Sequence, residues 1–92
     1  MVERIIEGCK DVMRVASSGE ALPDVETGSR YVEAETGLKR RTDDLEERIA
    51  RFGRAKSFVI VVPNGDIKET YRKLESGRVT VKTLYEFLHE EP

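Results

Sequence analysis

Five consecutive apolar residues, Phe58–Val62, constrain the fold of this chain more than any other feature. The last four are β-branched, and a short run of this kind, bounded by turn residues, is typical of a strand. Side chains alternate between the two faces of a strand, so an unbroken apolar run predicts a sheet that is covered on both faces. Pro63, Asn64 and Gly65 then end the strand. The pattern indicates a parallel or mixed sheet flanked by helices.

The residues before this strand are predicted to form a helix, three short strands and a second helix. The predicted ranges are a helix over 2–10, strands over 12–16, 22–26 and 30–36, and a helix from Thr42 to about Phe52. Thr27-Gly28 is the expected centre of a tight turn between the second and third strands. Thr42, Asp43 or Asp44 is expected to cap the second helix, and Gly53 to end it.

The residues after the apolar run complete an α/β pattern. Asp66 is predicted to cap a helix whose inward residues are Ile67, Tyr71 and Leu74. A strand over 78–82 follows, and Thr83 caps a C-terminal helix. The order α-β-β-β-α-β-α-β-α contains no repeat and no linker. We therefore expect residues 1–92 to form a single domain.

Composition narrows the functional classes. Charged residues make up 37% of the chain with a formal net charge of -2, which argues against a strongly basic nucleic-acid-binding domain. Cys9 is the single cysteine, so neither an intrachain disulfide nor a cysteine zinc site can form. No apolar run approaches the ~20 residues of a membrane span, and the early charges are not those of a signal peptide. We expect a cytoplasmic protein without a membrane partner, and the abundance of Glu, Arg, Lys and Val is compatible with a thermophile.

Three carboxylates on the predicted hairpin, Asp24, Glu33 and Glu35, form the candidate functional site. With Thr27-Gly28 as the turn, Asp24 faces Tyr31 and lies diagonal to Glu33, with Cβ atoms within about 7–8 Å. Strand alternation places the three carboxylates on one face. Carboxylate oxygens suit Mg²⁺ or Mn²⁺, and such an ion activates water and neutralises charge in phosphodiester hydrolysis. Alternation alone also produces glutamates on the solvent face of a hairpin, so this second interpretation stays open.

Two short motifs on this hairpin resemble those of the PD-(D/E)XK nucleases, in particular archaeal Holliday junction resolvases. Pro23-Asp24 is similar to the first acidic motif, and Glu33-Ala34-Glu35 stands where the family carries its acid-x-Lys motif. Ser17-Ser18-Gly19 corresponds to the loop that lies beside the scissile phosphate in resolvases. The resemblance covers about residues 2–62. It implies a restriction endonuclease-like core, α-β-β-β-α-β with a mixed central sheet, followed by a C-terminal α-β-α extension.

The resemblance also implies a function: a Mg²⁺- or Mn²⁺-dependent nuclease that acts on the phosphodiester backbone of structured DNA. Nothing in the sequence excludes RNA as the substrate. Its expected metal ligands are Asp24, Glu33, Glu35 and Glu7. Its expected DNA contacts are Ser17, Ser18, Arg40 and Arg41. A homodimer is expected, joined through apolar surface of the first or last helix, because related resolvases cut two strands symmetrically.

Two departures from the family pattern keep an alternative open. Glu35 occupies the place of the motif lysine, and Lys39 is the residue that could reach back to replace it. The first helix, which would carry Glu7, is also short. Arg40 and Arg41 have a second interpretation, as a solvated face paired with acidic residues of the following helix. The net negative charge, the missing lysine and the short first helix favour a non-catalytic adaptor that retains the nuclease core and binds a protein partner.

Overall fold

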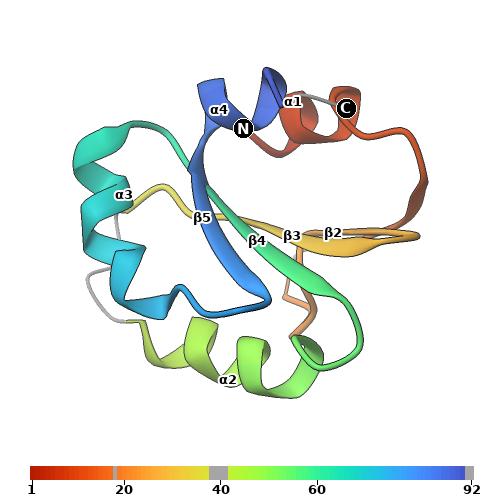
Figure 1. Cartoon of the computed structure of the whole chain (residues 1–92). Coiled ribbons are helices and arrows are strands. Elements are labelled where there is room, and N and C mark those ends of the chain that lie inside the picture. The colour runs from red at the N-terminus through yellow and green to blue at the C-terminus, as the bar shows by residue number, and fades with distance from the viewer. Residues whose placement is uncertain (18, 38–41, 91–92) are drawn as a thin grey trace.

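A five-stranded mixed sheet with helices on both faces forms the centre of the molecule (Figure 1). The computed structural model describes residues 1–17, 19–37 and 42–90. The helices are α1 (Val2–Glu7), α2 (Asp43–Phe52), α3 (Gly65–Tyr71), which continues into a 3-10 turn over Arg72–Leu74, and α4 (Leu84–Leu88). The strands are β1 (Val12–Val15), β2 (Val25–Thr27), β3 (Arg30–Ala34), β4 (Ser57–Val62) and β5 (Val79–Thr83).

The strands lie in the sheet in the order in which they occur in the sequence, β1-β2-β3-β4-β5. β1, β2 and β3 are antiparallel neighbours, whereas β4 is parallel to both β3 and β5. Crossovers through α2 and α3 make the two parallel pairings possible. The predicted α/β class, element order and mixed sheet are confirmed.

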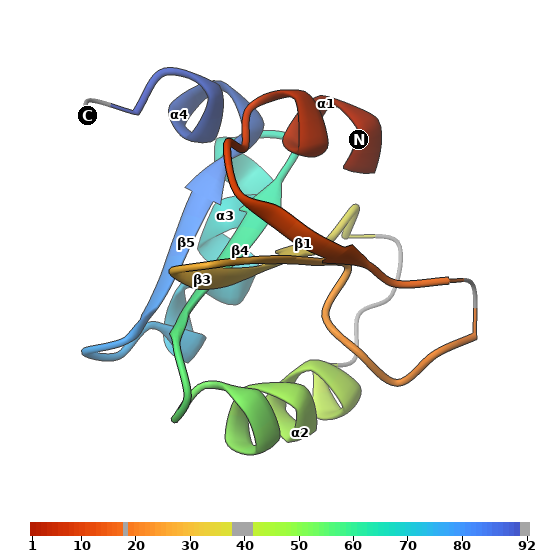
Figure 2. The same ribbon diagram turned by 90° about the vertical axis from the view of Figure 1, so that its right-hand side faces the viewer.

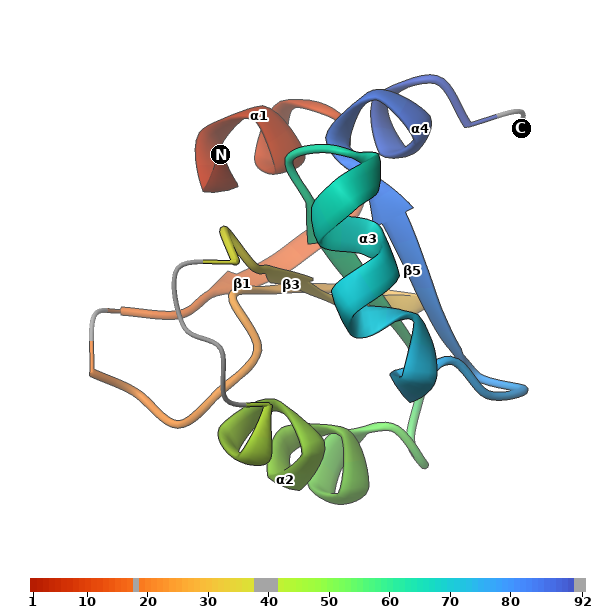
Figure 3. The same ribbon diagram turned by 90° about the vertical axis from the view of Figure 1, so that its left-hand side faces the viewer.

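Two apolar layers cover the sheet, as the unbroken apolar strand β4 requires. Phe58, Ile60 and Val62 pack with residues of α2, α3 and β5 on one face. Val59 and Val61 pack with residues of α1, β2, β3 and α4 on the other. Figure 2 shows α1 and α4 on one side of the sheet and α2 on the other, and Figure 3 shows α3 lying against β5. Within the described ranges, no helix has the length and apolar character needed to cross a membrane.

The hairpin between β2 and β3 corrects the predicted turn. Val25 pairs with Val32 and Glu26 with Tyr31, so Gly28-Ser29 is the centre of the turn instead of Thr27-Gly28. The Thr27 hydroxyl explains the difference, because it accepts hydrogen bonds from the backbone N–H groups of Ser29 and Arg30, at 3.3 and 3.1 Å, and donates to the Arg30 carbonyl. β2 is also shorter than predicted and begins at Val25.

Two predicted helix caps are also corrected. Asn64 caps α3, since its side chain accepts a hydrogen bond from the Ile67 N–H at 3.0 Å; Asp66 lies inside the first turn. Thr42 stands at the N-cap position of α2, but its hydroxyl bonds the Glu46 carboxylate instead of a backbone N–H.

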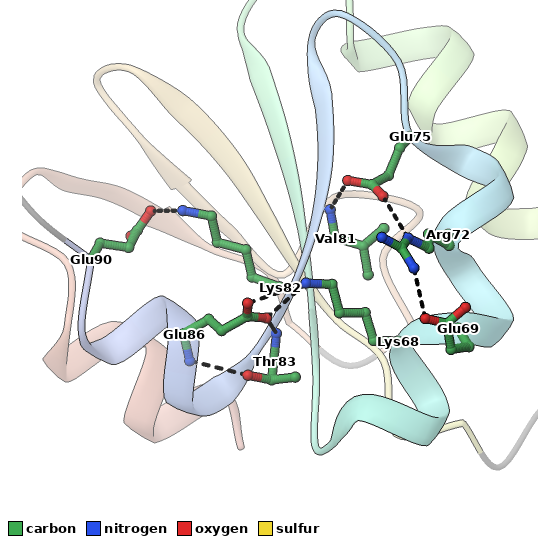
Figure 4. Close-up of polar contacts among 9 residues, drawn as sticks. All are labelled: Lys68, Glu69, Arg72, Glu75, Val81, Lys82, Thr83, Glu86 and Glu90. Atoms are coloured by element: carbon green, nitrogen blue, oxygen red, sulfur yellow. Dashed lines mark hydrogen bonds and ion pairs between the residues drawn. The ribbon is translucent and has the colours of Figure 1, made fainter.

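Side chains from α3, α4 and the segment after α4 converge on β5 (Figure 4). Thr83 and Glu86 form a reciprocal capping box at the start of α4, as predicted for Thr83. Lys68 of α3 bonds the same glutamate at 2.9 Å. Beyond α4, Glu90 accepts hydrogen bonds from Lys82 and from both terminal nitrogens of Arg30, so its carboxylate ties the end of α4 to β3 and β5.

The contacts of Glu90 with Arg30 and Lys82 form a clamp, and its contribution to stability should depend on pH. The Arg30 guanidinium, aided by Lys82, lowers the pKa of Glu90 from 4.5 to about 2. The clamp therefore contributes stability above about pH 4.5 and loses it as the pH falls towards 2. Glu90→Gln should lower the free energy of unfolding at neutral pH by roughly 1–2 kcal/mol, measured by urea denaturation, and the deficit should shrink on acidification.

Glu69→Gln is the matched control for this prediction, because Glu69 pairs with Arg72 at the surface, with both side chains more than half exposed. Its effect should stay within about 0.5 kcal/mol. A Glu90→Gln deficit no larger than that of Glu69→Gln would contradict the clamp.

Candidate functional site

Asp24 and Glu33 lie directly opposite each other where β2 begins and β3 nears its end. Val25, the first residue of β2, pairs with Val32, so Asp24 comes just before this pair and Glu33 just after it. This register differs from the one in which Asp24 was predicted to face Tyr31. Asp24 is fixed from two sides. Its carboxylate accepts a hydrogen bond from the Ala34 N–H at 2.8 Å, and its carbonyl accepts one from the Ala16 N–H at 2.9 Å.

Glu33 is a buried carboxylic acid in the α2 face of the sheet. Its residue is 1% exposed, and its parallel partner on β4 is Ile60, a core residue of that face. Its carboxyl group is in hydrogen-bond contact with Asp24. The second polar partner is Arg48 of α2, whose Nη1 donates to Glu33 Oε2 at 3.2 Å. Among the described residues, every buried side-chain nitrogen or oxygen has a hydrogen-bond partner, so Glu33 is buried without an unsatisfied atom.

The surroundings of Glu33 favour its neutral form. Burial, followed by the hydrogen bond and the negative charge of Asp24, raises the pKa of Glu33 from 4.5 to about 9, although Arg48 acts in the opposite direction. At neutral pH, Glu33 therefore carries a proton that it can donate to Asp24. Two adjacent carboxylates that retain a proton when no cation is bound are a suitable pair of ligands for one, because the cation takes over the role of the proton.

Glu35 lies on the same face as Glu33 but contacts α3 instead of α2. The Tyr71 hydroxyl of α3 donates to Glu35 Oε2 at 3.5 Å, and the Glu35 N–H donates to the Val61 carbonyl of β4 at 2.9 Å. Burial and then the charge of Glu35 raise the pKa of Tyr71, so the phenol stays protonated and available as a donor. Glu35 is thus held between β4 and α3.

The remaining predicted site residues are placed separately. Glu7 is exposed on α1, and α1 packs through Ile5 on the face of the sheet opposite Glu33, so the sheet separates Glu7 from the Asp24–Glu33 pair. Ser17 is exposed in the loop after β1, next to the residue that bonds Asp24, and its N–H donates to Glu20 at 2.6 Å. The other four predicted residues lie outside the described parts of the chain: Ser18, Lys39, Arg40 and Arg41.

The donor set fits a hard divalent cation bound through two carboxylates. Mg²⁺ takes oxygen ligands and keeps several waters, so one or two carboxylates are enough to hold it. Asp24, just before β2, and Glu33 of β3 supply these oxygens. In the described ranges, no group of three or more His, Cys, Asp or Glu side chains is arranged around one point. The geometry therefore brings together two of the predicted acids and leaves Glu35 beside Tyr71.

Arg48 was absent from the sequence-based site, although the sequence holds a signal for it. Leu45 and Phe52 lie on the sheet-facing side of α2, and Arg48 is three residues after the first and four before the second. Residues at these spacings share one side of a helix, so a charged residue there needs a buried partner. Glu33 is that partner.

Comparisons of the chain with models of known protein families, with curated proteins and with solved structures found no match.

The Asp24–Glu33 pair predicts that Glu33 destabilises the metal-free protein when it ionises. Because the pKa of Glu33 is raised from 4.5 to about 9, the folded state retains a proton that the unfolded state loses in this interval. The contribution of the protonated pair is present below about pH 4.5 and is lost as the pH rises through 9. Glu33→Gln keeps the shape and cannot ionise, so its stability relative to wild type should increase steadily across this range in urea denaturation without divalent ions.

Glu7→Gln provides the control, since it makes the same substitution at an exposed position on the opposite face. Its difference from wild type should remain nearly constant over the same interval. Parallel pH profiles for Glu33→Gln and wild type would show that Glu33 is not a buried, protonated acid.

Proposed function

We propose that this chain is a divalent-cation-dependent nuclease that acts on the backbone of structured DNA, with Asp24 and Glu33 as the metal ligands. The observation that carries the proposal is the burial of Glu33 in hydrogen-bond contact with Asp24. A glutamate on the solvent face of a hairpin would be exposed, whereas Glu33 is enclosed by the sheet and α2. A buried acid beside a second carboxylate is costly unless its charge is compensated, and such arrangements are frequent at functional sites.

The topology supports the same proposal. The elements α1-β1-β2-β3-α2-β4 follow the order expected of a restriction endonuclease-like core, and α3, β5 and α4 form the expected C-terminal extension. The paired acids lie on the β2–β3 hairpin, where the motifs of the PD-(D/E)XK resemblance place them. The loop that holds Ser17 closes beside them, through the hydrogen bond from Ala16 to Asp24.

The residues have distinct roles in this proposal. Asp24 and Glu33 would hold Mg²⁺ or Mn²⁺, which supplies Lewis acidity and a more acidic bound water. Glu35, fixed by Tyr71, would orient the attacking water, or Lys39 would do so in place of the missing motif lysine. The loop at Ser17 and Ser18 would contact the scissile phosphate. Arg40 and Arg41, which follow the hairpin in sequence, would contact the neighbouring backbone.

A homodimer belongs to the proposal, because symmetric cutting of two strands needs two sites. The exposed large apolar residues that could contribute to an interface are Val12, Met13 and Val15 of β1, and Tyr85 of α4. Tyr85 lies on the last helix, which is one of the two helices where an interface was expected. The β1 residues add the edge strand as a second possible contact surface.

A non-catalytic adaptor is the second candidate function, and three observations favour it. Glu35 replaces the motif lysine, and Arg48 already supplies a positive charge to Glu33. The edge strand β1 also exposes three apolar side chains that a protein partner could cover. An adaptor would need the fold but no divalent ion.

Metal binding separates the two functions. Calorimetric titration of the wild type with Mg²⁺ and with Mn²⁺ should show binding, and Asp24→Asn should weaken it by at least about tenfold. Asparagine retains an oxygen for the Ala34 N–H and removes the negative charge, so the hairpin should persist. Asp66→Asn, an exposed change in α3, is the control and should bind like wild type. If the wild type binds neither Mg²⁺ nor Mn²⁺, the nuclease proposal fails and the adaptor remains as the candidate function.

DNA cleavage tests the activity itself. Labelled branched, flapped and linear DNA should be incubated with Mg²⁺ and the wild type, Glu33→Gln or Asp66→Asn. We expect cleavage of branched DNA by the wild type and the control, and a rate at least roughly 100-fold lower for Glu33→Gln, since the ion contributes several kcal/mol. Equal traces of cleavage from wild type and Glu33→Gln would indicate a contaminating nuclease and contradict the assignment.

A further inference from the structure

Arg48 covers the buried acid of the candidate metal site. Its guanidinium reaches from α2 to the sheet, where Nη1 lies 3.2 Å from Glu33 Oε2. The Glu33 side chain is 2% exposed and that of Arg48 is 30% exposed, so the guanidinium lies between the carboxyl group and solvent on this side. Figure 1 shows α2, the helix to which Arg48 belongs, running beneath the sheet.

We propose that Arg48 is a built-in cation that occupies the approach to Glu33 and competes with a divalent ion for it. The inference rests on the proposed function, because it concerns the same metal site. A guanidinium and a divalent ion on one carboxyl group repel each other strongly where water is scarce. The ion can therefore bind well only when Arg48 withdraws, and Arg48 sets the affinity of the site.

The structure provides a place for the withdrawn side chain. A surface hollow of about 260 Å³ adjoins Arg48. Its lining residues are Ala21, Asp44, Glu47, Arg48 and Arg51. Two of these are acidic and exposed, so the guanidinium would exchange one carboxyl partner for others there. Arginine has several rotatable bonds, and a move of this kind needs no change in the backbone of α2.

Arg48 thereby has two positions with opposite consequences. Over Glu33, it neutralises the acidic pair and keeps the core closed in the absence of metal. In the hollow, it exposes Glu33 to an incoming ion. Occupancy of the site by a metal ion therefore depends on the position of the Arg48 side chain.

The test compares affinities for Mn²⁺ alone, measured by calorimetry and by the electron paramagnetic resonance signal of free Mn²⁺. Arg48→Met removes the charge and keeps much of the length, and it should bind Mn²⁺ at least about tenfold more tightly than wild type. Arg48→Lys restores a positive charge and should return affinity towards the wild-type value. Arg51→Met removes a neighbouring charge from the same helix and hollow, and should change affinity by no more than about twofold.

The outcomes distinguish this inference from the proposed function. If the wild type binds Mn²⁺ and Arg48→Met binds no more tightly than Arg51→Met, Arg48 is not a competitor, although the metal site stands. Binding by Arg48→Met but not by wild type supports the competition and contradicts metal use by the native chain. If no variant binds, both proposals fail. Thermal denaturation checks that each variant is folded, and Arg48→Gln replaces Arg48→Met if the latter is not.

Discussion

The burial of Glu33 beside Asp24 is the interaction on which the rest of the site depends. A carboxylate with 1% exposure cannot remain ionised at low cost without a cation or several donors. The molecule meets this requirement with a raised pKa, a hydrogen-bond contact with Asp24 and the guanidinium of Arg48. Each partner comes from a different element, so the position of Glu33 links β2, β3 and α2.

The fold explains why these three elements meet. Parallel pairing with β4 places Glu33 beside Ile60 in the core, and α2 must cross that face to connect β3 to β4. The antiparallel hairpin brings Asp24 opposite Glu33, and the Thr27 hydroxyl fixes the turn that sets this pairing. The result is a polar pair next to the apolar cluster that Phe58, Ile60 and Val62 form with α2, α3 and β5. A sheet that served only to support the fold would gain more from an apolar residue at this position, and this supports the proposal that Glu33 has a function.

The sequence predicted those parts of the molecule that local patterns determine. The apolar run over 58–62 gave a doubly covered strand, and the Thr83 cap and the element order followed from turn and helix signals. Strand alternation placed Asp24 and Glu33 on one face, and a shift of the register by two residues left that result unchanged. Patterns could not show that Thr27 belongs to the strand, or that Asn64 caps α3 in place of Asp66. Sequence patterns also could not predict the contact of Arg48 with Glu33, because this contact depends on how α2 packs against the sheet.

A crystal structure of the protein soaked in Mn²⁺, with anomalous diffraction recorded at the manganese edge, tests the central claim most directly. The account predicts an anomalous peak within about 2.0–2.3 Å of carboxylate oxygens from both Asp24 and Glu33, with the Arg48 guanidinium moved away from Glu33. The same sheet with no peak at this position, and with Arg48 still bonded to Glu33, would contradict it.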